Sequence, residues 1–193
     1  MRLFVAVELD DATREAVRQE QQLAAKQLGR KSSLRLIDPR QVHLTLVFLG
    51  EVQSAMVDSL TDLMKQPIGE AAPFRLGIGG LGAFPPHGAP RILWLGLTSG
   101  ARQITELHRA ITSRVAVLGI PLEDRAFRPH LTIGRWRDAR PSDRPRFDAG
   151  SVIRAVAEMT VDRVTLFESR LSSQGASHFP LAHAQLSATA AKP

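Results

Sequence analysis

The sequence predicts a fold of mixed class, α+β or α/β, in which a sheet packs against helices. Short apolar segments typical of strands alternate with amphipathic segments typical of helices in both halves of the chain. One short segment is also repeated: His43–Leu46 reads His-Leu-Thr-Leu, and His130–Ile133, 87 positions later, reads His-Leu-Thr-Ile. The 193 residues suit one domain, or two small lobes that share an interface.

The first half of the chain begins with an apolar run that predicts a strand, and Asp10-Asp11 then caps a helix that ends near Gly29. The run Val42–Leu49 is apolar except for His43 and Thr45, which predicts a buried strand. In order, the expected elements are a strand at 3–9, a helix at 10–29, a strand at 41–52, a helix at 54–65 and a glycine-rich strand at 74–82.

The second half contains the clearest helix, in which Ile104, Leu107, Ile111 and Val115 recur at helical spacing and Gly119 suits the C-cap. Proline and glycine predict the loops. In order, the expected elements are a loop at 84–90, a strand at 91–98, a helix at 101–118, a strand at 131–133, a loop rich in arginine and proline at 135–147, strands at 159–168 and 181–186, and a disordered tail at 188–193.

The repeated segment pairs a reactive face with a core face. Side chains of a strand alternate, so His43 and Thr45 share one face, as do His130 and Thr132, while the leucines and the isoleucine point to the other. Histidine exchanges a proton near neutral pH, and a threonine hydroxyl donates to a phosphoryl oxygen. From the composition, on the order of 0.01 copies of such a segment are expected by chance, so two copies indicate function.

Two histidines supply the groups needed to open a cyclic phosphate. A base deprotonates the attacking water and an acid protonates the departing ribose oxygen, on opposite sides of phosphorus. Threonine hydroxyls and an arginine stabilise the extra negative charge of the transition state, and Arg135 lies five residues beyond His130. The competing interpretation, two satisfied core histidines, is favoured for a single copy but not for a repeated His/Thr pair.

Composition limits the other function classes. The chain has no cysteine, which excludes disulfides, thiolate nucleophiles and Cys-type metal sites. No carboxylate or third histidine stands at ligand spacing to either repeat, so neither a metal nor a cofactor is expected. The net charge of +6 favours anionic partners. The apolar start is too short for a signal peptide and no run is long enough to span a membrane, which predicts a cytoplasmic protein.

The two His-x-Thr segments resemble the 2H phosphoesterase superfamily and, within it, the RNA 2',3'-cyclic phosphodiesterase group, historically called 2'-5' RNA ligases. The similarity follows the order and spacing of five segments, at 2–9, 41–51, 91–97, 127–135 and 166–171. It implies an α+β, bilobal fold over residues 1–187, with two pseudo-symmetric lobes of antiparallel sheet, helices packed outside and a central groove. It further implies a monomer that acts on RNA or an oligonucleotide with a cyclic phosphate end.

The same resemblance implies a role for each repeated residue. His43 is the expected proton donor to the leaving 3'-oxygen, and His130 the expected base acting on water, with a 2'-phosphomonoester as product. Thr45, Thr132 and Arg135 are expected to hold the phosphate. Two positions depart from the group and concern nucleobase or ribose contacts: Leu36 stands where tryptophan is frequent, and His178 stands where a Gly-Pro-x-Tyr segment has tyrosine.

The remaining candidates have ordinary explanations. We expect His87, His108, His178 and His183 at the surface, with His178 near the groove if the family pattern holds. Trp94 is expected in the core, although it could stack a base, and Phe48 and Phe127 are also assigned to the core. Seven arginines and two aspartates between 125 and 146 fit an RNA-backbone contact and an ordinary solvated loop about equally.

Two other hypotheses stay open at this point. Within catalysis, the substrate could be another cyclic nucleotide, ADP-ribose cyclic phosphate or a 2'-5' linkage, including reversible ligation of RNA ends. From a different class, the chain could be an RNA-end binding module without turnover, although binding an anion does not require titratable groups at two matched positions.

Overall fold

The computed structural model describes all residues except 30–31, 70, 123–125, 145–153, 173–174 and 188–193. Nine strands and three α-helices are found in the described part, with two short 3-10 turns at Pro39–Gln41 and Pro141–Asp143. In chain order they are β1 (Arg2–Glu8), α1 (Asp11–Leu28), β2 (Leu34–Leu36), β3 (His43–Glu51), α2 (Ser54–Leu63), β4 (Phe74–Phe84), β5 (Ile92–Ser99), α3 (Ala101–Ala116), β6 (Leu131–Trp136), β7 (Ala155–Val161), β8 (Arg163–Ser172) and β9 (Gly175–Gln185).

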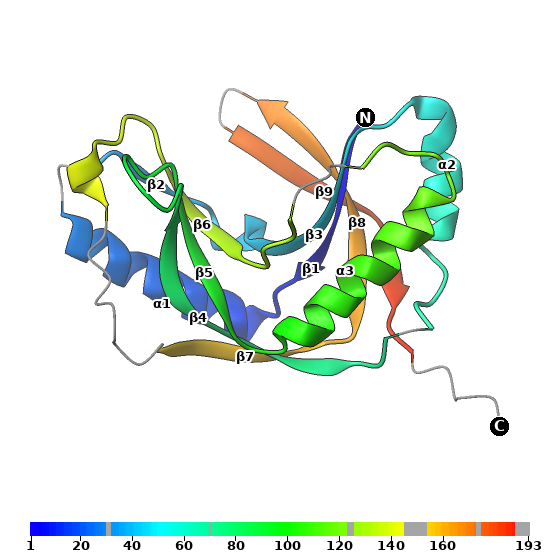
Figure 1. Ribbon diagram of the computed structural model, residues 1–193, viewed down its shortest axis with the longest axis horizontal. Coiled ribbons are helices and arrows are strands. Elements are labelled where there is room, and N and C mark those ends of the chain that lie inside the picture. Colours follow the sequence, from blue (N-terminus) through cyan, green and yellow to red (C-terminus); the bar gives the residue numbers. More distant parts are fainter. Residues whose placement is uncertain (30–31, 70, 123–125, 145–153, 173–174, 188–193) are drawn as a thin grey trace.

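All nine strands belong to one curled sheet with the order β7-β4-β5-β6-β3-β1-β8-β9, and β2 pairs with β6 (Figure 1). The pairings between these strands are antiparallel, which makes the fold α+β rather than α/β. The order is symmetric about the β6–β3 contact. We call β3, β1, β8 and β9 the first lobe, and β6, β5, β4, β7 and β2 the second lobe.

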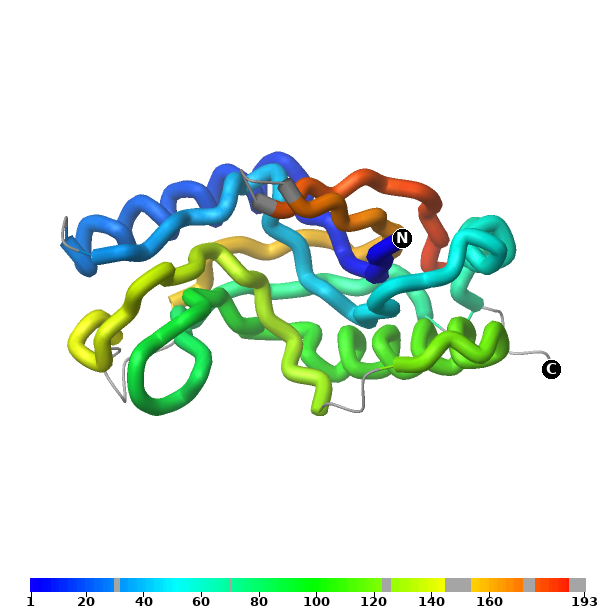
Figure 2. Tube along the Cα trace, turned by 90° about the horizontal axis from the view of Figure 1, so that it is seen from above, coloured from blue at the N-terminus to red at the C-terminus, as the bar shows by residue number. Residues whose placement is uncertain are grey.

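A strand–helix–strand unit is repeated across this centre, as β1-α1-β3 and as β5-α3-β6. The helices cross over: α1 follows a strand of the first lobe but contacts β6 and β7, whereas α3 follows a strand of the second lobe but contacts β3. Figure 2 shows the two helices at opposite ends of the long axis. The repeated unit therefore corresponds to the two-lobe symmetry that the family resemblance implies.

Local sequence explains both helices. The carboxylate of Asp10 accepts a hydrogen bond from the Thr13 amide at 2.7 Å and caps α1, and Gly29 follows its end with a φ of 73°. The four apolar residues that predict α3 are all fully buried. Each such side chain contributes about 1.5–3 kcal/mol on burial, so this face fixes α3 against the sheet.

The sheet has one helix-covered face and one face that we call the open face. Leu44 and Leu131 are 0% exposed and belong to the same core cluster as the buried side chains of α1 and α3. A separate small cluster, formed by Phe4, Ala6 and Phe167, lies on the other side of the sheet. Alternation along each strand therefore turns His43, Thr45 and Thr132 toward the open face.

Several expected elements differ from the structure. β6 continues to Trp136, so Arg135 lies in a strand and not in the expected loop. The segment expected as one strand at 159–168 forms the end of β7 and the start of β8, which turn at Asp162 and pair in different lobes. Val161 and Val164 are both buried, so the apolar pattern passes through this corner without a turn signal.

The expected tail at 188–193 lies outside the described residues, and the assignment of residues 1–187 to one bilobal domain stays a prediction. β2 was not expected, because its three residues are too few for a periodic pattern. No helix in the described ranges is both long and apolar enough to cross a membrane.

Candidate active site

The two repeated segments meet at the centre of the sheet. Leu44 of β3 and Leu131 of β6 are antiparallel Cα partners. In an antiparallel ladder the flanking residues then face each other, which sets His43 opposite Thr132 and Thr45 opposite His130, all four on the open face. His43 and His130 are then diagonal neighbours, which in such a ladder are about 7–8 Å apart.

Both imidazoles are oriented by the same local contact. The Nδ1 atom of His43 lies 2.8 Å from the carbonyl oxygen of Gln41, and Nδ1 of His130 lies 2.7 Å from that of Arg128. A carbonyl oxygen only accepts, so Nδ1 carries the proton in each ring. In the neutral state each Nε2 is then a base, and in the charged state it is a proton donor.

His43 lies in an aromatic environment. Its ring stacks on Phe4 at 4.9 Å between centroids and meets His178 edge-on at 5.0 Å. This burial is the main cause that lowers the pKa of His43 to about 4. The Gln41 carbonyl and Glu8, the Cα partner of His43 on β1, oppose the shift of this pKa, and the charges of His178 and Arg135 add to it.

His130 directly precedes β6 and is half-buried. Its ring lies edge-on to Phe84 at 5.2 Å and 6.4 Å from Trp94. The Trp94 indole covers Gly82 of β4 so closely that a Cβ at this glycine would collide with it. Trp94 therefore supports His130 from the open face instead of packing in the main core, where the sequence assigned it.

A β-bulge in β6 determines the face on which the Arg135 side chain lies. β5 pairs Leu93 with Gly134 but Trp94 with Thr132, so Ile133 is an extra residue in β6. The bulge reverses the alternation beyond it. Trp136 consequently joins the core, and Arg135 is exposed on the same face as Thr132.

β3 carries a bulge at the equivalent place. β1 pairs Val5 with Val47 but Ala6 with Thr45, which leaves Leu46 as the extra residue. Phe48, five residues after its histidine as Arg135 is after His130, is thereby turned to the open face and is 52% exposed. Its assignment to the core was wrong, because uninterrupted alternation would have placed it beside Leu44.

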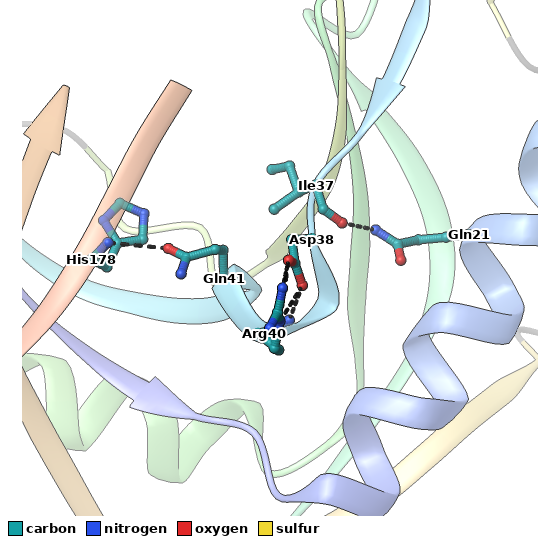
Figure 3. Close-up of polar contacts among 6 residues, drawn as sticks. All are labelled: Gln21, Ile37, Asp38, Arg40, Gln41 and His178. Carbon is teal, nitrogen blue, oxygen red and sulfur yellow. Dashed lines mark hydrogen bonds and ion pairs between the residues drawn. The ribbon is translucent and has the colours of Figure 1, made fainter. Parts of the chain in front are cut away.

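The side chain of Gln21 in α1 donates hydrogen bonds at the β6 bulge. This side chain is 2% exposed, and its Nε2 donates to the carbonyl oxygens of Ile37 at 2.7 Å and Ile133 at 2.8 Å. Figure 3 shows the amide pointing from α1 to the segment that leads into β3. The carbonyl of the extra residue in β6 thus accepts from this buried amide and from the Ile37 backbone N–H at 3.1 Å.

Two further residues, His178 and Gln41, lie beside the first repeated histidine. The His178 amide donates to Oε1 of Gln41 at 3.1 Å, as Figure 3 shows, and the Gln41 carbonyl orients His43. Burial lowers the pKa of His178. Gln41 therefore ties β9 to the first repeated histidine. The family pattern had suggested this location for His178, but nothing in the sequence pointed to Gln41.

The other histidines lie away from the central pair. His87 is exposed in its loop. His108 does not lie free on the surface as expected, because its ring stacks on Phe127 at 4.1 Å and its Nδ1 lies 2.8 Å from the Leu46 carbonyl. His183 contacts the fully buried Thr165 at 2.9 Å. Phe127 packs against the core, as expected.

The arginine-rich stretch divides into two parts. The Arg144 side chain donates to the carbonyl oxygens of Pro85 and Gly88, so it anchors the 84–90 loop. Arg128, Arg135 and Arg137 are exposed. Its first residue, Arg125, and its last, Arg146, lie outside the described residues. Leu36, which stands where tryptophan is frequent in the similar group, lies on β2. Alternation places it on the face opposite to its neighbour Arg35.

In the described part of the chain, no group of three or more His, Asp or Glu side chains has the arrangement of a metal site. The open face of the neighbouring strands β3 and β6 carries two imidazoles, two hydroxyls and a guanidinium. Such a set can bind a phosphoryl group and move protons on both sides of it.

Sequence comparison shows the family to which the chain is similar. The family model described as the 2'-5' RNA ligase superfamily matches residues 9–172. A protein of Archaeoglobus fulgidus named RNA 2',3'-cyclic phosphodiesterase is 31% identical over 180 residues, covering 91% of this chain and 94% of that protein. An Aquifex aeolicus protein of the same name is 31% identical over 160 residues, covering 78% and 80%.

Solved structures have the same architecture. TT0787 of Thermus thermophilus has a TM-score of 0.78 at 27% identity, covering 98% of this chain and 100% of that one. The apo form of LigT from E. coli has a TM-score of 0.72 at 24% identity, covering 96% and 97%, and so shares the fold. With the family match over most of its length, this chain belongs to the 2'-5' RNA ligase superfamily.

Proposed function

We propose that the protein is a hydrolase that opens terminal 2',3'-cyclic phosphates of RNA or oligonucleotides to 2'-phosphomonoesters. The observation that carries the proposal is the central ladder, in which each histidine faces the threonine of the other repeat across β3 and β6. The relatives in A. fulgidus and Aq. aeolicus, which match most of the chain, bear the name RNA 2',3'-cyclic phosphodiesterase.

In the proposed reaction, Nε2 of His130 takes a proton from water while the water oxygen bonds to phosphorus. The bond from phosphorus to O3' breaks, and O3' takes a proton from Nε2 of His43, leaving the phosphate on O2'. Thr45, Thr132 and Arg135 donate hydrogen bonds to the phosphoryl oxygens, where negative charge increases in the transition state. None of these steps requires a metal ion.

Substrate binding favours the protonated form of His43, which the proposed proton transfer to O3' requires. With its pKa lowered to about 4, His43 is neutral at pH 7 in the free protein. An anionic phosphodiester placed beside the ring favours the charged imidazolium, and Nδ1 is already bonded to the Gln41 carbonyl. Substrate binding therefore recruits the proton that His43 later gives to O3'.

The test uses a short RNA with a 2',3'-cyclic phosphate end. The wild-type protein should convert it to the 2'-phosphate in the presence of EDTA, and His43→Ala and His130→Ala should each slow turnover by about 10²–10⁴-fold. Phosphorus NMR of the product distinguishes the 2'-phosphate from the 3'-phosphate.

The outcomes separate the competing functions. Loss of RNA affinity with unchanged hydrolysis in both variants would establish a binding module. Joining of a second RNA with a 5'-hydroxyl would establish ligation, and preference for ADP-ribose cyclic phosphate would change the substrate class. The cytoplasmic location and the monomeric state stay predictions, and light scattering of the purified protein measures the latter.

A further inference from the structure

Two arginines face each other across β2 and β6. Arg35 and Arg135 are antiparallel Cα partners, and both side chains are exposed. The adjacent partners, Leu34 and Trp136, pack in or against the main core. Cross-strand partners share a face, so Arg35 lies on the open face together with Arg135.

This arrangement is unfavourable for the protein alone. Like charges directly opposite each other destabilise a sheet. Arg40 is close in the chain but is paired with Asp38, as Figure 3 shows. By contrast, neither Arg35 nor Arg135 has an ion pair or a side-chain hydrogen bond within the part of the chain that the structure describes. A ligand with negative charge would relieve the repulsion.

The Arg35–Arg135 pair lies next to the central site, along the same edge of β6. β3 and β2 are successive segments that both pair with this edge, through Leu44 at Leu131 and through Leu36 at Gly134. Arg35 is separated from Arg135 by one strand spacing, about 5 Å, on the side away from β5. A chain that enters the central site along β6 would pass over both guanidinium groups.

We propose that Arg35, together with Arg135, binds the phosphate that precedes the cyclic phosphate in an RNA strand. The inference rests on the proposed function and narrows its substrate class to polynucleotide ends rather than cyclic mononucleotides. Two guanidinium groups offer ten N–H donors, and their planar geometry matches phosphate oxygens. Arg135 then bridges the two phosphates, while Arg35 contacts only the preceding one.

The test compares adenosine 2',3'-cyclic phosphate with a trinucleotide that ends in the same group. Arg35→Gln should lower kcat/KM for the trinucleotide on the order of tenfold and for the mononucleotide less than twofold. The slope of log kcat/KM against log salt should fall by about 0.7 for the trinucleotide. Arg35→Lys should retain most of the activity, and Arg109→Gln, an exposed change on α3, should match the wild type on both substrates.

Unfolding would not explain a loss of activity in Arg35→Gln. Removing one of two like charges on facing strands should leave Tm unchanged or raise it. Equal losses on both substrates, or no loss on the trinucleotide, would overturn the inference. If the wild type hydrolyses neither substrate, the proposed function fails separately. Fluorescence anisotropy with a 5'-labelled trinucleotide ending in a 2'-phosphate then decides the inference, since Arg35→Gln must still weaken binding on the order of tenfold.

Discussion

His43 and His130 carry the same tautomer, set by the same backbone contact, yet their environments differ. Phe4 and His178 pack on the first ring, whereas Phe84 and Trp94 lie edge-on to the second. The difference follows from the surrounding strands: β1, which pairs with β3, supplies Phe4, whereas β4, which lies beyond β5, supplies Phe84. Identical motifs thus acquire different aromatic surroundings from their neighbours.

The buried imidazole makes stability depend on pH. Because the pKa of His43 is about 4 in the folded state and near 6.5 when unfolded, the unfolded state binds more protons between these values. The stability from this group is present above pH 6.5 and is lost as pH falls toward 4. Between pH 7 and pH 5 we expect a loss of about 2 kcal/mol, measured by urea denaturation, from this residue.

His43→Gln is the matched variant for this measurement, because glutamine does not titrate. The difference in unfolding free energy between wild type and variant should shrink as pH falls from 7 to 5. A constant difference over that range would show that the His43 ring stays accessible to protons in the folded protein.

Phe48 is exposed on the open face and does not pack in the core. The ring is 52% exposed and lies 6.2 Å from Phe4, which stacks on His43. Stacking of a base on an aromatic ring contributes about 1–3 kcal/mol, so Phe48→Ala should raise KM for a cyclic-phosphate RNA by about 5- to 150-fold. Tm should change little. A large fall in Tm with unchanged KM would restore the core assignment.

At the scale of elements, the two bulges decide which side chains reach the open face. Both fall three residues after a histidine, and both reverse the alternation before the fifth residue. The repeated His-x-Thr segments could be predicted to share a face because two-residue alternation holds over that length. The orientation of Phe48 could not, since a bulge depends on the register of a partner strand that is distant in sequence.

The buried amide of Gln21 offers a test of the bulge. Gln21→Met should leave the carbonyls of Ile37 and Ile133 less satisfied and lower the unfolding free energy by about 1–3 kcal/mol. The variant should also lose activity through misplacement of Arg135. Gln22→Met, an exposed change on the same helix, serves as the control.

A double-mutant cycle separates positioning from stability. In an Arg135→Gln background, Gln21→Met should still lower stability but should cost little further activity, because the group it positions is already gone. Additive losses in activity would mean that Gln21 acts on the site by another route.

At the scale of the molecule, the sequence predicts most elements, because strands and caps are local patterns, and its family resemblance implies the two-lobe symmetry. It fails at β2, which is short, and at Asp162, where the apolar pattern continues through a corner between lobes. It also could not place Gln41 or Gln21, whose importance comes from contacts made across 137 and 112 positions of sequence.

The crossed helices have a consequence for the stability of one strand–helix–strand unit on its own. A single strand–helix–strand unit, alone in water, would leave the apolar side of its own sheet bare, because its helix covers the sheet of the other unit. Two copies of such a unit would have to exchange helices to hide that surface. A half-length chain with one such unit is therefore expected to form a helix-swapped homodimer and not a stable monomer.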